Sequence, residues 1–363
     1  MGSRREFLGK AAAAAGVCFT GCGLLGPHAH AQGGRRLVTV GGKRTKVIDV
    51  HAHCSVPAAM DLVGLKVGGL NRPDLVIPAT LDQRLAAMDA QGIDMEALSI
   101  NAFWYDKDRD LAKKICEIQN EMLAEVVAKN SERFVAFASV ALQHPDLAVE
   151  QLVQGVKKYN LRGAAIGGSV AGKEISDPSL NPFWAKVEEL GVPVFIHPQG
   201  SGATTELKQR FTGNGYLDNV IGFPLETTIA LSHLIFEGTL DRYPRLKIVS
   251  AHGGGFLPSY AARHDFGCLT APARCQPAPY GPIKKKPTEY LKQMYYDTMV
   301  FTPEGLRHLI AEVGASQLMI GTDYPFPWTK TAVDHVLNTP GLSDADKAAI
   351  LEGNAAKVLG LTA

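Results

Sequence analysis

Eight short apolar runs recur along the chain, and they constrain its fold more than any other feature. Helix-like segments separate them, an alternation typical of βα units and a parallel sheet. The runs are nearly continuous in apolar character, as expected for strands buried on both faces. Eight strands close a (β/α)₈ barrel, so the sequence predicts this α/β fold. The predicted strands are 46–50, 95–99, 134–140, 161–166, 192–196, 246–250, 294–299 and 317–321.

The segments between these runs carry helix signals. Thr80 and Asp146 are suited to N-cap positions, and Pro178 and Pro303 stand where a first helical turn accepts proline. The predicted helices are 80–90, 110–130, 146–159, 178–190, 226–237 and 303–313.

Three longer insertions follow the first, fifth and sixth strands, at 55–78, 200–224 and 267–287. They lie on the loop face, where barrels of this kind bind substrates, so we expect them to form pocket walls or lids. Residues 32–43 are predicted to form a short arm or strand before the barrel. No internal repeat or second-domain linker interrupts the chain.

The charge balance excludes several kinds of partner. Among 363 residues, 37 are Lys or Arg and 36 are Asp or Glu, so no strong field exists to hold nucleic acid or an anionic membrane surface. Hydrophobic residues make up 46% and charged residues 20%, which is typical of a soluble enzyme rather than a disordered chain. We therefore expect a small-molecule partner and no nucleic acid.

The first residues have the features of an export signal. Arg4 and Arg5 precede a modestly apolar stretch at 11–25, and Ala29-His30-Ala31 has the small-x-small form of a cleavage site. Residues 1–31 are therefore predicted to be a signal peptide for the twin-arginine export machinery. The mature barrel is then 32–363.

Export by this route predicts a periplasmic protein. A lipid anchor at Cys22 is the alternative, although residues 19–21 make a poor lipobox by resemblance. No other stretch is expected to reach the roughly 20 apolar residues that span a bilayer.

Four cysteines remain after removal of the signal, and their spacing fits no zinc-cysteine module. Cys268 and Cys275 could form a disulfide that bridges a loop in an oxidising compartment. Two free thiols are the alternative, and the sequence does not choose between them.

Metal-binding residue types end several of the predicted strands. His51 and His53 alternate by two, so both side chains point to the same face and can hold one ion. His197 ends the fifth strand, and Asp323 ends the eighth. The carboxyl ends of barrel strands meet at one face, so these groups are expected to converge. Three imidazoles and a carboxylate suit a divalent ion and leave a position open, as in catalytic metal sites.

His252 ends the sixth strand in the same way. We expect it to act as a general base or hydrogen-bond donor beside metal-bound water. The alternatives are a further metal ligand and a purely structural histidine.

With these residues in view, the chain resembles the amidohydrolase-related family that includes aminocarboxymuconate semialdehyde decarboxylase. The resemblance covers nearly all of the mature chain, and its motifs together are specific for the family. They are Ile48 to His53, Phe195 to Pro198, Gly222 to Thr228, Arg242 to Ile248, Ala251 to Gly255 with Leu257-Pro258, and Gly321 to Pro325.

The resemblance implies a (β/α)₈ barrel with one divalent metal, for which zinc is expected ahead of manganese, cobalt or iron. It places the metal ligands at His51, His53, His197 and Asp323 and the catalytic histidine at His252. Some members replace the first histidine by glutamate, whereas this chain keeps His51. Members are commonly dimers, so a homodimer is expected.

Fold and metal do not choose the reaction, because the family includes carboxy-lyases, hydratases and hydrolases. We expect a carboxy-lyase on a small aromatic or unsaturated carboxylic acid, with Asp323 or His252 protonating the carbon that loses carbon dioxide. The alternative is a hydrolase of a lactone, ester or amide that uses metal-bound hydroxide, and export favours it. A binding protein that has lost turnover is a third hypothesis, disfavoured because all five polar positions are present.

Residues near the predicted strand ends are candidates for substrate contact. Aromatic side chains following the second and eighth strands, with Trp104, Phe326 and Trp328 foremost, could sandwich a planar acid. Arg263 could clamp a substrate carboxylate, although a surface role is equally compatible with the pattern.

Two further positions bear on the metal. Glu226 is predicted to orient a ligand histidine, with a plain helix N-terminal charge as the alternative. Residues Ile166-Gly167-Gly168 offer no lysine where a bridging carboxylated lysine would be expected, which favours one metal over two.

Overall fold

The computed structural model describes residues 34–65, 73–101, 103–199, 209–276 and 281–361. The predicted signal peptide, 1–31, lies outside the described residues. Residues Arg35–Ala363 make up one compact unit. The predicted division at residue 31 therefore stays a prediction.

The described chain contains two parallel ladders of strands, β3-β4-β5 and β6-β7-β10-β11-β12-β13. Every predicted strand is present, with ends that shift by a few residues. The strands are β3 (Ile48–His53), β4 (Met95–Ser99), β5 (Phe134–Ala136), β6 (Ala138–Ser139), β7 (Ala164–Gly167), β10 (Pro193–His197), β11 (Lys247–Ser250), β12 (Tyr295–Asp297) and β13 (Leu318–Met319).

Backbone contacts join the two ladders at both ends. β5 and β6 form one segment interrupted only at Phe137, which is why the sequence shows a single run there. On the other side, the Val50 N–H donates to Ile320 O at 3.0 Å, and the Asp323 N–H donates to His51 O at 2.8 Å. The order of eight parallel strands is thus that of a (β/α)₈ barrel, as the sequence predicts.

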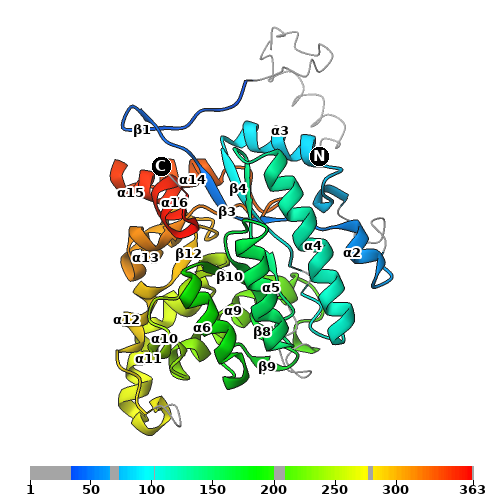
Figure 1. Cartoon of the computed structure of the whole chain (residues 1–363). Helices are drawn as coiled ribbons and strands as arrows, with labels where there is room; N and C mark the ends of the chain where they lie inside the picture. Colours follow the sequence, from blue (N-terminus) through cyan, green and yellow to red (C-terminus); the bar gives the residue numbers. More distant parts are fainter. Residues whose placement is uncertain (1–33, 66–72, 102, 200–208, 277–280, 362–363) are drawn as a thin grey trace, which may run out of the picture. The chain divides into compact units, whose positions relative to one another are not determined.

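Helices follow the strands and cover their outer side; Figure 1 shows α4, α5 and α6 along one flank of the strands. The main helices are α2 (Pro57–Asp61), α3 (Leu81–Gln91), α4 (Arg109–Lys129), α5 (Pro145–Lys157), α6 (Asn181–Leu190), α8 (Leu217–Val220), α9 (Gly222–Phe236), α10 (Thr239–Arg242), α11 (Leu257–Thr270), α12 (Pro287–Tyr290), α13 (Pro303–Val313), α14 (Ala332–Asn338), α15 (Asp344–Ala348) and α16 (Asn354–Leu359).

Local chemistry explains several boundaries. The Thr302 hydroxyl accepts a hydrogen bond from the Gly305 N–H, and Pro303 opens α13, so this helix has the predicted limits. The predicted N-cap at Asp146 is wrong, because α5 already begins at Pro145 and the Asp146 carboxylate pairs with Arg109 instead. The α9 helix begins at Gly222, four residues before its predicted start.

Two small hairpins lie outside the barrel. The first, β1 (Thr39–Val40) with β2 (Lys43–Arg44), belongs to the arm predicted before the barrel. The second, β8 (Ser169–Val170) with β9 (Lys173–Glu174), follows β7 and was not predicted, because its strands are too short to leave a periodic pattern.

Within the described residues, Leu217–Phe236 is long and apolar enough to cross a bilayer by composition, with a mean hydropathy of 1.2. This contradicts the expectation that the mature chain has no such stretch. Here the segment forms α8 and α9, and α9 packs against neighbouring helices of the barrel with Ala230, Leu231 and Leu234 buried.

The four cysteines after residue 31 separate into two kinds. Cys268 and Cys275 form a disulfide that joins α11 to the short helix η5 (Pro272–Cys275). Cys54 and Cys116 are buried free thiols. Of the two alternatives left open by the sequence, the structure therefore has the disulfide.

Candidate active site

The end of β3 supplies the first two histidines of the site. Both side chains are buried, and the Nε2 atoms of His51 and His53 lie 2.9 Å apart. The pairing of β3 with β4 shifts register between Asp49 and Ala52, so the end of this strand is irregular. The two imidazoles nevertheless converge, as the two-residue spacing predicts.

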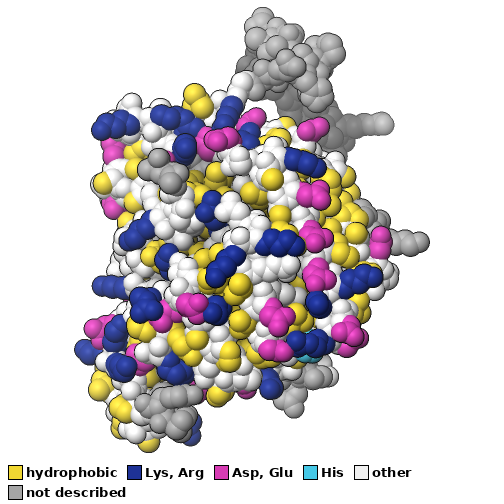
Figure 2. All heavy atoms as spheres, viewed as in Figure 1, with side chains coloured by type: hydrophobic (Ala, Val, Ile, Leu, Met, Phe, Trp, Pro, Cys, Tyr) yellow, Lys and Arg dark blue, Asp and Glu magenta, His cyan; other side chains and the backbone are white. Residues whose placement is uncertain are grey.

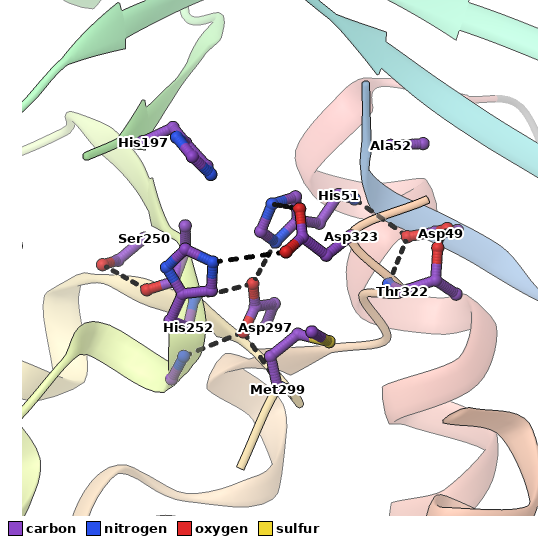
Figure 3. Close-up of polar contacts among 12 residues, drawn as sticks. Asp49, His51, Ala52, His197, Ser250, His252, Asp297, Met299, Thr322 and Asp323 are labelled. Atoms are coloured by element: carbon purple, nitrogen blue, oxygen red, sulfur yellow. Dashed lines mark hydrogen bonds and ion pairs between the residues drawn. The ribbon is translucent and has the colours of Figure 1, made fainter. Parts of the chain in front are cut away.

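Three other strand ends bring their polar groups to the same point. Asp323 Oδ1 lies 2.6 Å from His53 Nε2 and 3.2 Å from His51 Nε2. Ligand atoms of His51, His197, His252 and Asp323 all lie within 4.8 Å of one another. Figure 3 shows these four side chains pointing toward one another from separate segments of the chain. All five predicted metal-site and catalytic residues therefore meet in one cluster.

Hydrogen bonds at the far side of two rings set their orientation. The Nδ1–H of His51 donates to Asp297 Oδ2 at 2.6 Å, and the Nδ1–H of His197 donates to the Pro198 carbonyl at 2.6 Å. Each bond turns the Nε2 edge of that ring toward the cluster. Fixing the far nitrogen in this way is how proteins orient metal-binding histidines.

Burial and charge set the protonation of the cluster. Burial lowers the pKa of His53 to about 4 and holds the pKa of His197 well below its ordinary value. Burial opposes ionisation of Asp323, but His51 and hydrogen bonds from the surrounding histidines outweigh it and hold the pKa of Asp323 well below its usual range. Burial likewise opposes the charged form of His51, yet Asp323 and Asp297 raise its pKa to about 10.

The donor set fits a divalent cation. Imidazole nitrogens and an ionised carboxylate converge on one point, and both are donor types that bind divalent ions. Two ligands about 2.1 Å from one ion lie about 3 Å apart when their bonds are near right angles, and the 2.9 Å between the His51 and His53 nitrogens agrees with this. Nitrogen and oxygen donors of this kind suit zinc, manganese, iron or cobalt.

His252 and Asp323 share an unusual backbone conformation. Their φ angles are +54° and +59°, in the left-handed region that residues with a side chain rarely adopt. Such conformations cost about 1–3 kcal/mol each and concentrate at functional sites. His51 and His53, in contrast, lie within β3 and are not among the residues with a positive φ.

A cavity of about 700 Å³ opens beside His252. Its walls come from α8, α9, α11, α13 and the loops after β12 and β13, and most of them are apolar. The aromatic lining residues are Phe223, Phe256, Phe301 and Trp328. A flat organic molecule could stack on these rings with one end at His252.

The predicted substrate-binding residues differ in their positions. The Phe326 ring meets the His53 ring edge-on, with centroids 5.6 Å apart, and Trp328 lines the cavity and stacks on Tyr216. Trp104 is half-buried in the loop after β4 and is not among the cavity-lining residues. Arg263 is exposed on α11 and does not reach the cavity of its own chain, so the structure gives no support to the carboxylate clamp.

Glu226 contacts the backbone that follows His197. Its side chain is buried, and Oε2 accepts a hydrogen bond from the Gln199 N–H at 3.0 Å. Gln199 follows His197 by two residues, so Glu226 holds the segment that leaves β10. The prediction that Glu226 orients a ligand histidine stays a prediction. The His197 ring itself donates its Nδ1–H to Pro198 O.

Asp297 belongs to the site but was not predicted from the sequence. It ends β12, is fully buried, and contacts both the His51 ring and the backbone of His252. The available signal was an aspartate that ends an apolar strand, Tyr295-Tyr296-Asp297, at the same barrel face. Ser99 and Asn101 were missed as well, with Ser99 Oγ lying 3.2 Å from His53 Nδ1.

Comparison with known proteins identifies relatives of this chain. Residues 48–361 match the amidohydrolase family. The chain is 32% identical over 284 residues to 2-amino-3-carboxymuconate-6-semialdehyde decarboxylase of Dictyostelium discoideum. The aligned region covers 77% of this chain and 76% of that protein. It is also 32% identical over 291 residues to gamma-resorcylate decarboxylase of a Rhizobium species, and this alignment covers 77% of this chain and 87% of that protein.

A solved structure is similar to this chain over most of its length. The crystal structure of a dihydroxybenzoic acid decarboxylase from a Polaromonas species, with bound manganese and the inhibitor 2-nitroresorcinol, matches with a TM-score of 0.75 at 30% identity. The match covers 87% of this chain and 97% of that chain.

Proposed function

The chain belongs to the amidohydrolase family, and from that premise we propose that it is a metal-dependent carboxy-lyase that removes carbon dioxide from a small aromatic or unsaturated carboxylic acid. One observation carries the proposal: the cluster of strand-end donors adjoins an aromatic-lined cavity through His252. The named relatives, which are decarboxylases of such acids, support it.

We propose that His51, His53, His197 and Asp323 hold one divalent ion. When bound, the ion supplies a Lewis acid that polarises oxygen atoms of the substrate. Zinc is expected from the imidazole-rich donor set, and the manganese in the related Polaromonas structure makes manganese the principal alternative. The absence of a lysine at Gly167 and Gly168, where β7 ends, favours a single ion.

His252 is the group best placed to deliver the proton. In an aryl decarboxylation the bond between ring and carboxylate breaks, its electron pair stays on the ring carbon, and that carbon must gain a proton as carbon dioxide leaves. His252 lines the cavity, whereas Asp323 does not. The two side chains are 3.7 Å apart, between His252 Nε2 and Asp323 Oδ2, so Asp323 can orient the imidazole.

The aromatic walls bind and shield the substrate. Phe223 and Phe256 lie in the cavity near His252, and Phe301 and Trp328 stand nearer the solvent, at 53% and 37% exposure. Stacking holds a planar ring in a fixed plane, and exclusion of water strengthens the charge interactions at the donor cluster.

The test is carbon dioxide release by the purified mature protein on a panel of hydroxybenzoic and dienoic acids, with matched lactones and esters as controls. Each substrate is tested after metal removal and after addition of zinc, manganese, cobalt or iron. Carbon dioxide that disappears with the chelator and returns with one metal is the expected result. Acid release from the lactones without carbon dioxide would contradict the proposal and support the hydrolase.

We propose further that residues 1–31 direct export and that the mature enzyme, 32–363, is periplasmic. The disulfide between Cys268 and Cys275 supports this location, because such bonds persist in oxidising compartments. Replacing Arg4 and Arg5 by lysine should retain the protein in the cytoplasm. Mass spectrometry of the exported form should give Gln32 as the first residue; a lipid on Cys22 would show an anchored protein instead.

The expected homodimer is tested by light scattering on the exported form. A mass of one chain across the working concentration range would remove that expectation.

A further inference from the structure

The turn that presents His252 has four successive residues with a positive φ, a conformation that is disfavoured at His252 and readily adopted by the three glycines that follow. His252, Gly253, Gly254 and Gly255 have φ angles of +54°, +61°, +79° and +64° in succession. A run of left-handed residues is costly wherever a side chain is present, and it persists only if surrounding groups hold it. The position of the His252 imidazole therefore depends on what anchors this turn.

Packing fixes two sides of the turn. A Cβ added at Gly253 would lie 2.6 Å from Val300 Cγ1, and one added at Gly254 would lie 2.7 Å from the Tyr296 ring. The turn is thus pressed against β12 and the segment that follows it. On the opposite side, a Cβ added at Gly255 would lie 2.2 Å from Pro224 O of α9, so the turn is packed between β12 and α9. A polar anchor then fixes the His252 end of the turn.

The Asp297 carboxylate is that anchor, and it is shared with the metal site. Its Oδ1 accepts hydrogen bonds from the Gly253 N–H at 2.8 Å and the Met299 N–H at 3.0 Å. Its Oδ2 accepts the His252 N–H at 2.8 Å and the His51 Nδ1–H at 2.6 Å. Figure 3 shows Asp297 between His51 and the His252 turn.

We propose that Asp297 is a positioning residue that couples the metal ligand His51 to the His252 turn. Binding of the metal and positioning of the His252 side chain then occur together. The inference rests on the proposed metal site. A single oxygen, Oδ2, contacts both partners, so a His51 ring that turns away from the cluster weakens the contact that holds His252. Because coupling is reciprocal, a turn that loosens also weakens the orientation of His51.

Asp49 provides a matched control. It is also a buried carboxylate near His51, and its Oδ1 accepts the His51 backbone N–H at 2.9 Å. Its other partners are the hydroxyl and N–H of Thr322. It contacts neither the His51 ring nor the His252 turn, so it shares the burial of Asp297 without the coupling.

The first test compares zinc affinity of Asp297→Asn and Asp49→Asn by competition with a chromophoric chelator. Loss of a group that orients a ligand histidine typically weakens metal binding about 10- to 100-fold, and this is expected for Asp297→Asn. The zinc affinity of Asp49→Asn should stay within about threefold of that of the unchanged protein, a smaller change than the one expected for Asp297→Asn. Equal affinity for the two variants would overturn the proposal.

The second test follows the turn itself by amide hydrogen exchange. In the unchanged protein, zinc should slow exchange at Gly253 and Met299; in Asp297→Asn, saturating zinc should leave those two amides unprotected. Zinc-dependent protection of the same size in both proteins would overturn the coupling.

The third measurement needs no variant. In the zinc-loaded protein, selective ¹⁵N labelling of histidine should show the His51 Nδ1 protonated, with a downfield proton resonance typical of a short bond to a carboxylate. An unprotonated Nδ1 would refute the assignment. None of the three measurements depends on carbon dioxide release. If they show the coupling but no substrate loses carbon dioxide, only the proposed function is refuted. If carbon dioxide is released but the coupling is not seen, only the coupling is refuted.

Discussion

The donor cluster and the aromatic cavity meet at His252 but are built in opposite ways. The cluster comes from strand ends, and His51, His53, His197 and Asp323 are all buried. The cavity comes from helices and loops outside the strands, and Trp328 and Phe301 at its rim are partly exposed. This difference indicates that the barrel fixes the chemistry rigidly, while the loops determine which acid is accepted.

The surface outside this site carries no dominant charge. Figure 2 shows Lys and Arg interspersed with Asp and Glu over the visible face, in line with the balanced composition. Selection of substrate thus depends on the cavity rather than on a long-range field.

The largest expected effect tests the rigid side of the comparison. Asp323→Asn removes the only carboxylate of the donor set while keeping its shape, so turnover should fall by more than about 10³-fold. Circular dichroism should show an unchanged fold, and bound metal should decrease. Asp334→Asn, which breaks an ion pair with Arg36, is the control and should keep activity. Near-normal turnover by Asp323→Asn would refute the proposed mechanism.

His252→Ala tests the junction of the two regions. Loss of a group that delivers a proton lowers turnover by about 10²- to 10⁴-fold, and this is expected here with metal content unchanged. Metal analysis of the purified variant checks the second part. Loss of the metal together with activity would make His252 a ligand rather than the proton donor.

Gly254→Ala tests whether the His252 turn tolerates a side chain. The new methyl group would meet the Tyr296 ring and occupy a φ of +79°, so unfolding free energy should fall by about 3 kcal/mol. Gly172→Ala has a similar φ of +84° but no atom within 4 Å, and it should lose only about 1 kcal/mol. Equal losses in urea denaturation would show that packing against Tyr296 contributes nothing.

Trp328→Ala tests the loop side and should have the smallest effect. Loss of one stacking ring at the rim should raise KM about 3- to 10-fold and leave kcat nearly unchanged, corresponding to about 1 kcal/mol of binding. Phe266→Ala, exposed on α11 away from the cavity, is the control. A larger change in kcat than in KM would place Trp328 in the chemistry instead of in binding.

The sequence predicted the strands and the cluster well because both depend on local patterns. A buried parallel strand needs an apolar run, and its end marks the face where a barrel collects polar groups. His51, His197, His252 and Asp323 each follow this rule, and the structure brings them together. The side chains on helices are harder to predict, as Arg263 shows, because it is exposed and does not line the cavity.

By itself, then, the sequence determined the order of strands, the kinds of donor and the class of chemistry they support. Only the tertiary structure decided how the donors are held, because that depends on contacts between residues far apart in the chain. Asp297 lies 246 positions from His51 and 45 from His252, yet one carboxylate contacts both. No periodic pattern encodes such a contact, since it arises only when separate strands of the barrel place their ends within hydrogen-bonding distance.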